Sequence, residues 1–395
     1  PLKIEDYELT KANLFETLST VVSDIDRHSE EALASRKNIS GELVKKIIKK
    51  TLFFPWRIPT FLSTISDAFA EKHVLAAFNR SGLAKAFYKR NWDGHIPDSN
   101  QGDFVAVNEG NYGGMKSDRY ITREITYQLE LTGAGDALGN PIVKAKLEVE
   151  ITHNGTYNIP LSGDYSGYLR TMVPLGSEVI SGTGMITETE NALIFSELID
   201  LPVGATVTYA YEYELPEYVW SGGYYNLKLF KQPGTNADTY QVIVKVPQGH
   251  SIEGSLFDVK ENIAFFETDL LTDVDLSFTV LPDSNPPRII SHEITALNEI
   301  TIEFNEALSV DYAESGFNYQ VTDADYTESS VTDPVKIVSA RVDGSKVILT
   351  TSGMTAQLDE RYSLELRDIR DLSGNLISPS PRIVTVIIKE KILKP

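Results

Sequence analysis

The chain contains no cysteine among its 395 residues. Disulfide bonds, thiolate nucleophiles and cysteine-ligated zinc sites are therefore excluded. Many secreted proteins depend on disulfides, but a bacterial surface protein does not need them. The absence of cysteine is thus neutral on the cellular compartment and mildly favours a bacterial exterior.

Basic residues are also scarce, because 36 Lys and Arg stand against 56 Asp and Glu and give a formal net charge of −20. Nucleic-acid binding requires a basic face, so we expect no nucleic-acid partner. The acidic balance is compatible with a solvated outer surface or with cation binding. No apolar run approaches the roughly 18 residues of a membrane helix, so we expect any membrane anchor to lie outside this chain. The start at Pro1 suggests a processed or trimmed product.

Recognisable catalytic signatures are missing from the sequence. The six histidines form no HExxH motif and no close pair, and neither a GxSxG motif nor a P-loop occurs. Acidic residues are abundant, so a carboxylate pair for glycoside cleavage stays open, although no pair stands out. We therefore assign no catalytic residue and no cofactor-binding residue.

Hydrophobic periodicity divides the chain at about residue 100. Before this point apolar residues recur at three- and four-residue steps, which indicates helices. After it they alternate with polar residues between Gly- and Pro-rich turns, which indicates strands. The pattern predicts an α+β protein with a helical region over 1–100, a central antiparallel β-sandwich over 101–282, a Pro-rich linker over 283–287 and an Ig-like β-sandwich over 288–395.

A lysine-rich amphipathic helix is predicted to follow Ser40. Its apolar side carries Val44, Ile47 and Ile48, its other side carries Lys45, Lys46, Lys49 and Lys50, and Phe53, Phe54 and Trp56 come next. One interpretation is a helix that docks on a membrane surface. The other is a helix whose apolar side packs on its own domain while its lysines are solvated. We favour the second, because soluble helices commonly show this pattern.

Tyrosines alternate with polar residues along the strand predicted at 206–215. An exposed row of tyrosines could stack on sugars, whereas an inward-facing row would fill the core. We favour core packing.

Acidic residues gather in the predicted loops of the C-terminal sandwich. Calcium takes six to eight oxygen ligands, and carboxylates at such spacing can supply several of them. The alternative is a set of solvated acidic loops, because no EF-hand spacing is present. The candidate calcium ligands are Asp323, Asp325, Asp368 and Asp371.

A polar, Gly-rich turn follows the first predicted strand. Asn111, Gly113 and Gly114 permit backbone conformations that other residues resist. Lys116 and Asp118 can pair or cap across this turn. The turn is either a structural lock between the helices and the sandwich or a ligand-binding loop, and we favour the lock.

The same segment carries a family resemblance. Asp103-Phe104-Val105-Ala106-Val107 and Asn111-Tyr112-Gly113-Gly114-Met115-Lys116-Ser117-Asp118, with Arg123 and Tyr127, resemble the bacterial surface family catalogued as domain of unknown function 4012. This resemblance implies a membrane-anchored protein of the cell exterior without an established activity. The C-terminal part, with Asp371-Leu372-Ser373-Gly374-Asn375, resembles the bacterial Ig-like domain of S-layer and adhesin-type proteins. Such domains act as spacers, interaction modules or lattice elements.

These observations together favour an extracellular structural or binding protein of the bacterial cell envelope, such as a surface-layer or adhesion component. Its expected partners are cell-envelope polymers or neighbouring surface proteins, with self-assembly through the Ig-like domain. The alternative is an envelope-glycan hydrolase or transferase that uses carboxylates we have not assigned. We favour the first function, because no catalytic constellation is visible.

Overall fold

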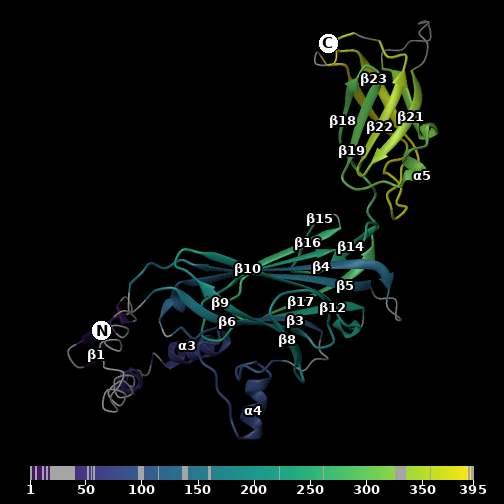
Figure 1. The fold of residues 1–395 in the computed structure, drawn as a ribbon. Coiled ribbons are helices and arrows are strands. Elements are labelled where there is room, and N and C mark those ends of the chain that lie inside the picture. Colours follow the sequence, from purple (N-terminus) through teal and green to yellow (C-terminus); the bar gives the residue numbers. More distant parts are fainter. Residues whose placement is uncertain are drawn as a thin grey trace.

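The computed structural model describes residues 2–4, 7–10, 13–14, 17, 41–50, 53–54, 56, 58–96, 102–113, 115–135, 141–158, 162–221, 223–260, 262–324, 335–355, 357–389 and 392. Over these residues the protein has the predicted α+β class and is mostly β. Figure 1 shows two β-sandwiches, with the C-terminal one standing away from one end of the first. We call them the first and the second sandwich. No helix among the described residues is long and apolar enough to cross a membrane.

Two facing sheets form the first sandwich. The seven-stranded sheet has the order β15 (Asp258–Lys260), β16 (Ile263–Asp269), β13 (Thr239–Lys245), β4 (Ile121–Gly135), β5 (Pro141–His153), β10 (Thr206–Glu214) and β7 (Glu178–Ser181). The eight-stranded sheet has the order β14 (His250–Glu253), β17 (Val274–Pro282), β12 (Tyr224–Phe230), β3 (Asp103–Asn111), β6 (Tyr165–Pro174), β9 (Ala192–Leu201) and β8 (Met185–Glu188), with β11 (Trp220–Ser221) beside β12. Two short 3₁₀ turns, η2 (Ser117–Tyr120) and η3 (Glu217–Val219), join strands.

Each of these sheets contains one parallel pair, where the sequence had predicted antiparallel pairing throughout. Strand β12 runs parallel to β3, and β13 runs parallel to β4. All other strand pairs described in this sandwich are antiparallel, including β4 with β5. Turn residues reveal pairing between strands that follow one another, whereas these parallel partners are more than 90 residues apart in the chain.

The core of the first sandwich lies between the inner faces of its two sheets. The alternation of β5 buries Leu147, Val149 and Ile151 completely, because period-two side chains of one set all point inward. Tyr211 and Tyr213 of β10 are also fully buried, which confirms the core interpretation of this strand for these two residues. Complete burial of one aliphatic side chain, such as Leu147 or Ile151, stabilises the fold by about 1.5–3 kcal/mol.

A carboxyl group is enclosed in this core. Asp103, at the start of β3, is 2% exposed and accepts hydrogen bonds from the hydroxyls of Tyr127 (2.8 Å) and Tyr225 (2.5 Å). Tyr127 belongs to the facing sheet, so Asp103 links the two layers. Burial raises the pKa of Asp103 to about 7, although the tyrosine hydrogen bonds oppose this shift.

Among its described residues, the N-terminal region is less helical than the sequence predicts. Tyr7, which lies in the region predicted to be helical, belongs instead to a two-stranded hairpin of β1 (Leu2–Ile4) and β2 (Tyr7–Leu9). Helical residues are found over 41–50, in α3 (Ile58–Ala70) and in α4 (Ser81–Tyr88). Rings of Phe69, Phe87 and Trp92 contact one another at centroid distances of 5.2 Å and join α3 to α4. Figure 1 shows both helices on the side of the eight-stranded sheet.

The second sandwich packs a four-stranded sheet on a three-stranded one. The first sheet has the order β18 (Ile289–Ala296), β19 (Glu299–Phe304), β22 (Lys346–Ser352) and β21 (Lys336–Asp343), and the second has β20 (Tyr319–Asp323), β23 (Arg361–Leu366) and β24 (Arg382–Ile387). Short helical turns α5 (Val310–Ala313) and η4 (Gly316–Asn318) precede β20. Residues between Pro282 and Ile289 form no strand or helix and connect the two sandwiches.

We predict that Asp103 makes the stability of the first sandwich fall as pH rises. Its pKa is higher in the folded state than in the unfolded state, so its contribution is fully present below about pH 4 and is lost as pH rises through about 7. Relative to Asp103→Asn, the wild-type free energy of unfolding should decline by about 4 kcal/mol over this interval. Urea titrations followed by tryptophan fluorescence measure this decline. None of the three tryptophans belongs to the second sandwich, because all of them precede β12 in the chain, so its unfolding contributes no tryptophan signal of its own.

Asp275→Asn is the matched control, because the Asp275 side chain is 77% exposed. This variant should keep the wild-type dependence on pH. Equal pH dependence in wild type and Asp103→Asn would contradict the prediction.

Candidate functional site

The predicted turn is held by its own side chains. Asn111, the last residue of β3, donates from Nδ2 to the Met115 carbonyl (2.8 Å) and to Asp118 Oδ1 (3.2 Å). Its Oδ1 accepts from the Gly113 N–H at 2.9 Å. Lys116 is half-buried, and Gly114 lies outside the described residues. The structure therefore brings Asn111, Gly113 and Asp118 together.

The turn is also attached to β6 and to the loop before it. The N–H groups of Tyr112 and Gly113 both donate to the Ser166 carbonyl at 3.1 Å. Gly113 has no positive φ. A Cβ placed on it would lie 3.3 Å from the Ser166 Cβ and backbone nitrogen, so close approach explains this glycine. These contacts support a structural turn.

Buried charges lie directly behind the turn. Arg123 of β4 is 6% exposed and binds Glu109 Oε2 of β3 at 2.9 Å and Asp238 Oδ1 at 2.8 Å. Burial raises the pKa of Glu109 to about 7 against the opposing attraction of Arg123. The bridge joins the two sheets of the first sandwich. Its loss would leave unpaired buried charges, which makes it structural.

The four predicted calcium ligands do not form one group among the described residues. Asp323 ends β20, and Asp325 lies outside the described residues. Asp368 forms an ion pair with Arg370 at 2.9 Å. Asp371 alone joins a group of carboxylates, and its partners there are Asp283 and Glu306.

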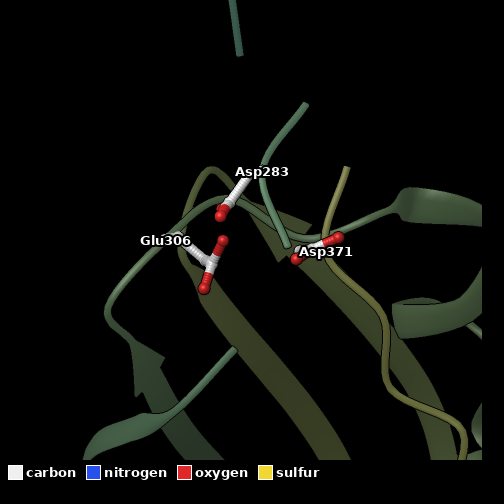
Figure 2. A group of neighbouring side chains, drawn as sticks. All are labelled: Asp283, Glu306 and Asp371. Atoms are coloured by element: carbon white, nitrogen blue, oxygen red, sulfur yellow. The ribbon is translucent and has the colours of Figure 1, made fainter. Parts of the chain in front are cut away.

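Asp283, Glu306 and Asp371, which we call the junction group, lie where the two sandwiches meet (Figure 2). Asp283 follows β17, Glu306 follows β19, and Asp371 follows β23, and each offers a carboxylate oxygen within 4.8 Å of the other two. Asp371 is buried, whereas Asp283 and Glu306 are half-buried. Strand order brings these distant loops to the same end of the second sandwich.

Hydrogen bonds tie the junction group to the first sandwich. The carbonyl of Gly249, just before β14, accepts from Asp283 N–H at 3.1 Å and from Ser373 Oγ at 2.5 Å. Asn375 donates from Nδ2 to Asp371 Oδ2 at 2.8 Å and to the Asp283 carbonyl at 2.7 Å. The group is therefore part of the contact between the sandwiches.

Three carboxylates this close repel one another unless a proton or a cation intervenes. Burial, a hydrogen bond with Asp283 and the charges of Asp283 and Asp371 raise the pKa of Glu306 to about 7. An all-oxygen donor set suits Ca²⁺, which is a hard cation. Junction-group residues would supply only part of its shell of six to eight oxygens.

Sequence reasoning missed Asp283 and Glu306. Asp283 stands within the predicted linker, and Glu306 stands in the Asn305-Glu306-Ala307 stretch of the Ig-like pattern. A usable signal was available. The start of β18 and the end of β19 lie at the same end of their antiparallel hairpin. Asp283, in the segment before β18, and Glu306, just after β19, could therefore be expected to lie near each other.

A groove opens on the outer face of the eight-stranded sheet. Its floor is formed by residues of β3, β12 and β17. These residues face outward, because the residues next to them in each strand face the core. They are Phe104, Asn226, Lys228, Phe230, Asp275 and Ser277. The segment at the end of α4 forms its wall with Tyr88, Arg90, Asn91, Trp92 and His95. The groove has a cavity volume of about 770 Å³.

Asp273 fixes the wall of this groove to its floor. Its carboxylate accepts from Lys72 Nζ (2.6 Å), Asn91 Nδ2 (2.8 Å) and the Lys231 N–H (2.9 Å). Asn91 is 6% exposed, and its Oδ1 has no hydrogen-bond partner among the described residues. Lys72 and Asn91 both have positive φ, at 57° and 51°. Strained, buried polar residues next to a groove are typical of binding sites.

Comparisons with known proteins give few matches. No family model matches the chain, and no curated protein matches it. The N-terminal part of the bacterial S-layer protein SbsC is 14% identical over 27% of this chain and 24% of its own, with a TM-score of 0.24. A protein described as nutrient-binding, from Legionella pneumophila, is 11% identical over 44% of this chain and 71% of its own, with a TM-score of 0.28.

An M1 zinc metallopeptidase from Deinococcus radiodurans is 13% identical over 47% of each chain, with a TM-score of 0.25. This chain thus spans about a quarter of the S-layer structure and about half of the metallopeptidase. At these TM-scores the likenesses carry no conclusion about function.

We predict that Glu306→Gln stabilises the protein above pH 7 and has little effect near pH 5. The pKa of Glu306 is raised in the folded state, so its stabilising contribution is present at low pH and is lost as pH rises through about 7. Solvent screens this half-buried group, so we expect a gain of about 1 kcal/mol at most at about pH 8. Scanning calorimetry at both pH values measures it.

Calcium binding at the junction group, which shares only Asp371 with the ligands predicted from the sequence, is tested in the same samples. Millimolar Ca²⁺ should raise the wild-type Tm over a chelator control, and Glu306→Gln should reduce that rise. Asp368→Asn is the control, because Asp368 pairs with Arg370 outside the junction group. If the Tm difference between wild type and Glu306→Gln is the same at both pH values, the raised pKa of Glu306 is contradicted. If Ca²⁺ does not raise the Tm of the wild type, the prediction of calcium binding is wrong.

Proposed function

We propose that the protein is a binding protein of the bacterial cell exterior that holds an envelope glycan in the groove beside α4. The observation that carries this proposal is the groove itself. Its volume of about 770 Å³ lies within the usual range of ligand sites, roughly 300–1,000 Å³. Its lining combines aromatic rings with hydrogen-bonding side chains.

The lining suits a sugar chain. Sugars present apolar ring faces, which stack on aromatic side chains, and hydroxyls, which both donate and accept hydrogen bonds. Tyr88 is 43% exposed at the rim and stacks on His95 with a centroid distance of 3.8 Å. Asn226 and Ser277 supply polar groups on the floor. Acidic and basic side chains are both present, which favours a neutral or mixed-charge ligand.

Binding is favoured over glycan cleavage because the carboxylates of the groove are already engaged. Asp273 accepts from three donors, and one of them is the Lys72 ammonium. Asp275 pairs with Lys228 at 3.2 Å. The Asp103 carboxyl accepts hydrogen bonds from core tyrosines. A glycosidase requires one carboxylic acid and one free carboxylate facing the scissile bond.

The location at the cell exterior is supported by the sequence resemblances and by the absence of cysteine. In this proposal the second sandwich is a spacer or a site of self-assembly that presents the first one. Figure 1 shows the second sandwich extending from one end of the first sandwich, away from α3 and α4 on the side of the eight-stranded sheet, which fits a spacer.

We predict that Tyr88→Ala weakens binding of solubilised bacterial cell-wall glycan fragments about 3- to 10-fold, because one aromatic stacking surface is lost. Isothermal titration calorimetry with wild type and variant measures the change. Folding should be retained, because Tyr88 is already 43% exposed at the end of α4.

Tyr112→Ala is the matched control, because Tyr112 is 62% exposed and lies in the turn rather than in the groove. This variant should bind like wild type. Undetectable binding by wild type, or equal losses in both variants, would reject the groove as a glycan site. Release of shortened fragments during the titration would favour the enzyme instead.

A further inference from the structure

The lysine-rich helix over 41–50 does not bury its apolar side among the described residues. Val44 is 54% exposed, Ile47 36% and Ile48 46%. The interpretation favoured from the sequence, with this side packed on the protein's own domain, therefore does not hold for these three residues. An apolar helix face in contact with water requires a partner, because its exposure costs free energy.

Large exposed aromatic side chains follow this helix in the chain. Phe53 is 76% exposed and Trp56 is 71% exposed, and both follow the helix directly. Their neighbour Phe54 contacts both rings at centroid distances of 5.1 Å. An exposed tryptophan beside a phenylalanine is typical of segments that enter the lipid headgroup region, where amphipathic rings are favoured.

The charge of this helix is opposite to that of the whole chain. Residues 41–50 contain four lysines and one glutamate, which is a net charge of +3 within a chain of net charge −20. The lysines lie at 45, 46, 49 and 50, on the side of the helix opposite to Val44, Ile47 and Ile48. Lysine side chains so placed can extend past the apolar face toward anionic headgroups while the stems cover apolar surface.

We propose that the exposed apolar side chains of Val44, Ile47, Ile48, Phe53 and Trp56, which together we call the docking face, lie on an anionic lipid bilayer. The apolar side chains would enter the headgroup boundary, and the four lysines would bind anionic lipid. Charge complementarity selects this occupant. An acidic chain is repelled by anionic lipid everywhere except at a local basic segment.

The docking face is separate from the groove. None of the described residues between 41 and 56 lines the groove, whose described lining starts at Ala70. Lipid binding and glycan binding can therefore fail independently. In the proposed orientation the bilayer is near the N-terminal helices, and the second sandwich lies at the other end of the molecule (Figure 1).

The experiment uses the full chain and extruded vesicles of phosphatidylcholine with or without about 30% phosphatidylglycerol. Wild type should co-sediment with the anionic vesicles at least about tenfold more strongly than with the neutral ones, and added salt should weaken it. Trp56→Phe should still bind but lose most of the blue shift of tryptophan emission, because Trp56 is the tryptophan on the docking face.

Two variants separate the contribution of the lysine charges to lipid binding from that of the apolar side chains. Replacing Lys45, Lys46, Lys49 and Lys50 by Gln should weaken partitioning at least about tenfold, because each lysine near the surface contributes attraction. The control replaces four exposed lysines elsewhere, Lys144, Lys245, Lys336 and Lys346, by Gln, with the same change of net charge. It should bind like wild type. Val44→Ser with Ile48→Ser should weaken binding by loss of apolar contact.

Several results would overturn the proposal. Equal binding to neutral and anionic vesicles would show that the lysines do not bind anionic lipid. Equal losses of binding in the two quadruple-lysine variants would show that the helix over 41–50 is not the binding segment. Sedimentation velocity without lipid provides a further check. Concentration-dependent dimers that disappear in the Val44→Ser, Ile48→Ser variant would identify a second copy of the chain as the occupant instead.

Discussion

The hydrogen bonds of one buried carboxyl group, that of Asp103, join the two sheets of the first sandwich. Asp103 begins β3, which lies between β12 and β6 in the eight-stranded sheet. On its inner face β3 contributes Asp103 and Glu109, which reach Tyr127 and Arg123 of the facing sheet. Hydrogen bonds and ion pairs are directional, so these contacts fix the position and register of β3 more narrowly than apolar packing would.

The other features depend on this strand. Its outward-facing Phe104 lies in the floor of the groove. Its last residue, Asn111, organises the turn that attaches the strand to β6. One strand thus carries the clamp between the sheets on its inner face, part of a ligand surface on its outer face and a structural turn at its end. The segment that shows the family resemblance in the sequence is this same strand and turn.

Much of the fold could be predicted from sequence because local patterns determine it. Alternation predicted the strand at 206–215, which is β10, and it identified the inward row that contains Tyr211 and Tyr213. The parallel neighbours of β3 and β4 could not be predicted, because no local signal links strands more than 90 residues apart. The N-terminal hairpin was missed because its strands have three residues each, which is too short for a period to appear.

The candidate sites were only partly accessible to sequence reasoning. Asp371 was chosen because it stands in an acidic loop, whereas Asp283 and Glu306 become its neighbours only through strand order. The groove was not predicted. Asn91 and Asp273 are 182 positions apart, and each is an ordinary polar residue in its own stretch of sequence. Exposure of the lysine-rich helix also depends on what packs against it, which periodicity cannot reveal.

The contact between the two sandwiches has a mechanical consequence. Each sandwich has its own apolar core, and the contacts described at their junction are hydrogen bonds around the Gly249 carbonyl, Asn375 and three carboxylates. The hydrogen bonds give this contact a well-defined geometry, whereas repulsion among the three carboxylates opposes the contact when all three are charged. The bending stiffness of the molecule at this point is therefore a function of pH and ionic composition. A load applied to the second sandwich would be transmitted to the first as a rigid lever under one set of ionic conditions and as a tether under another.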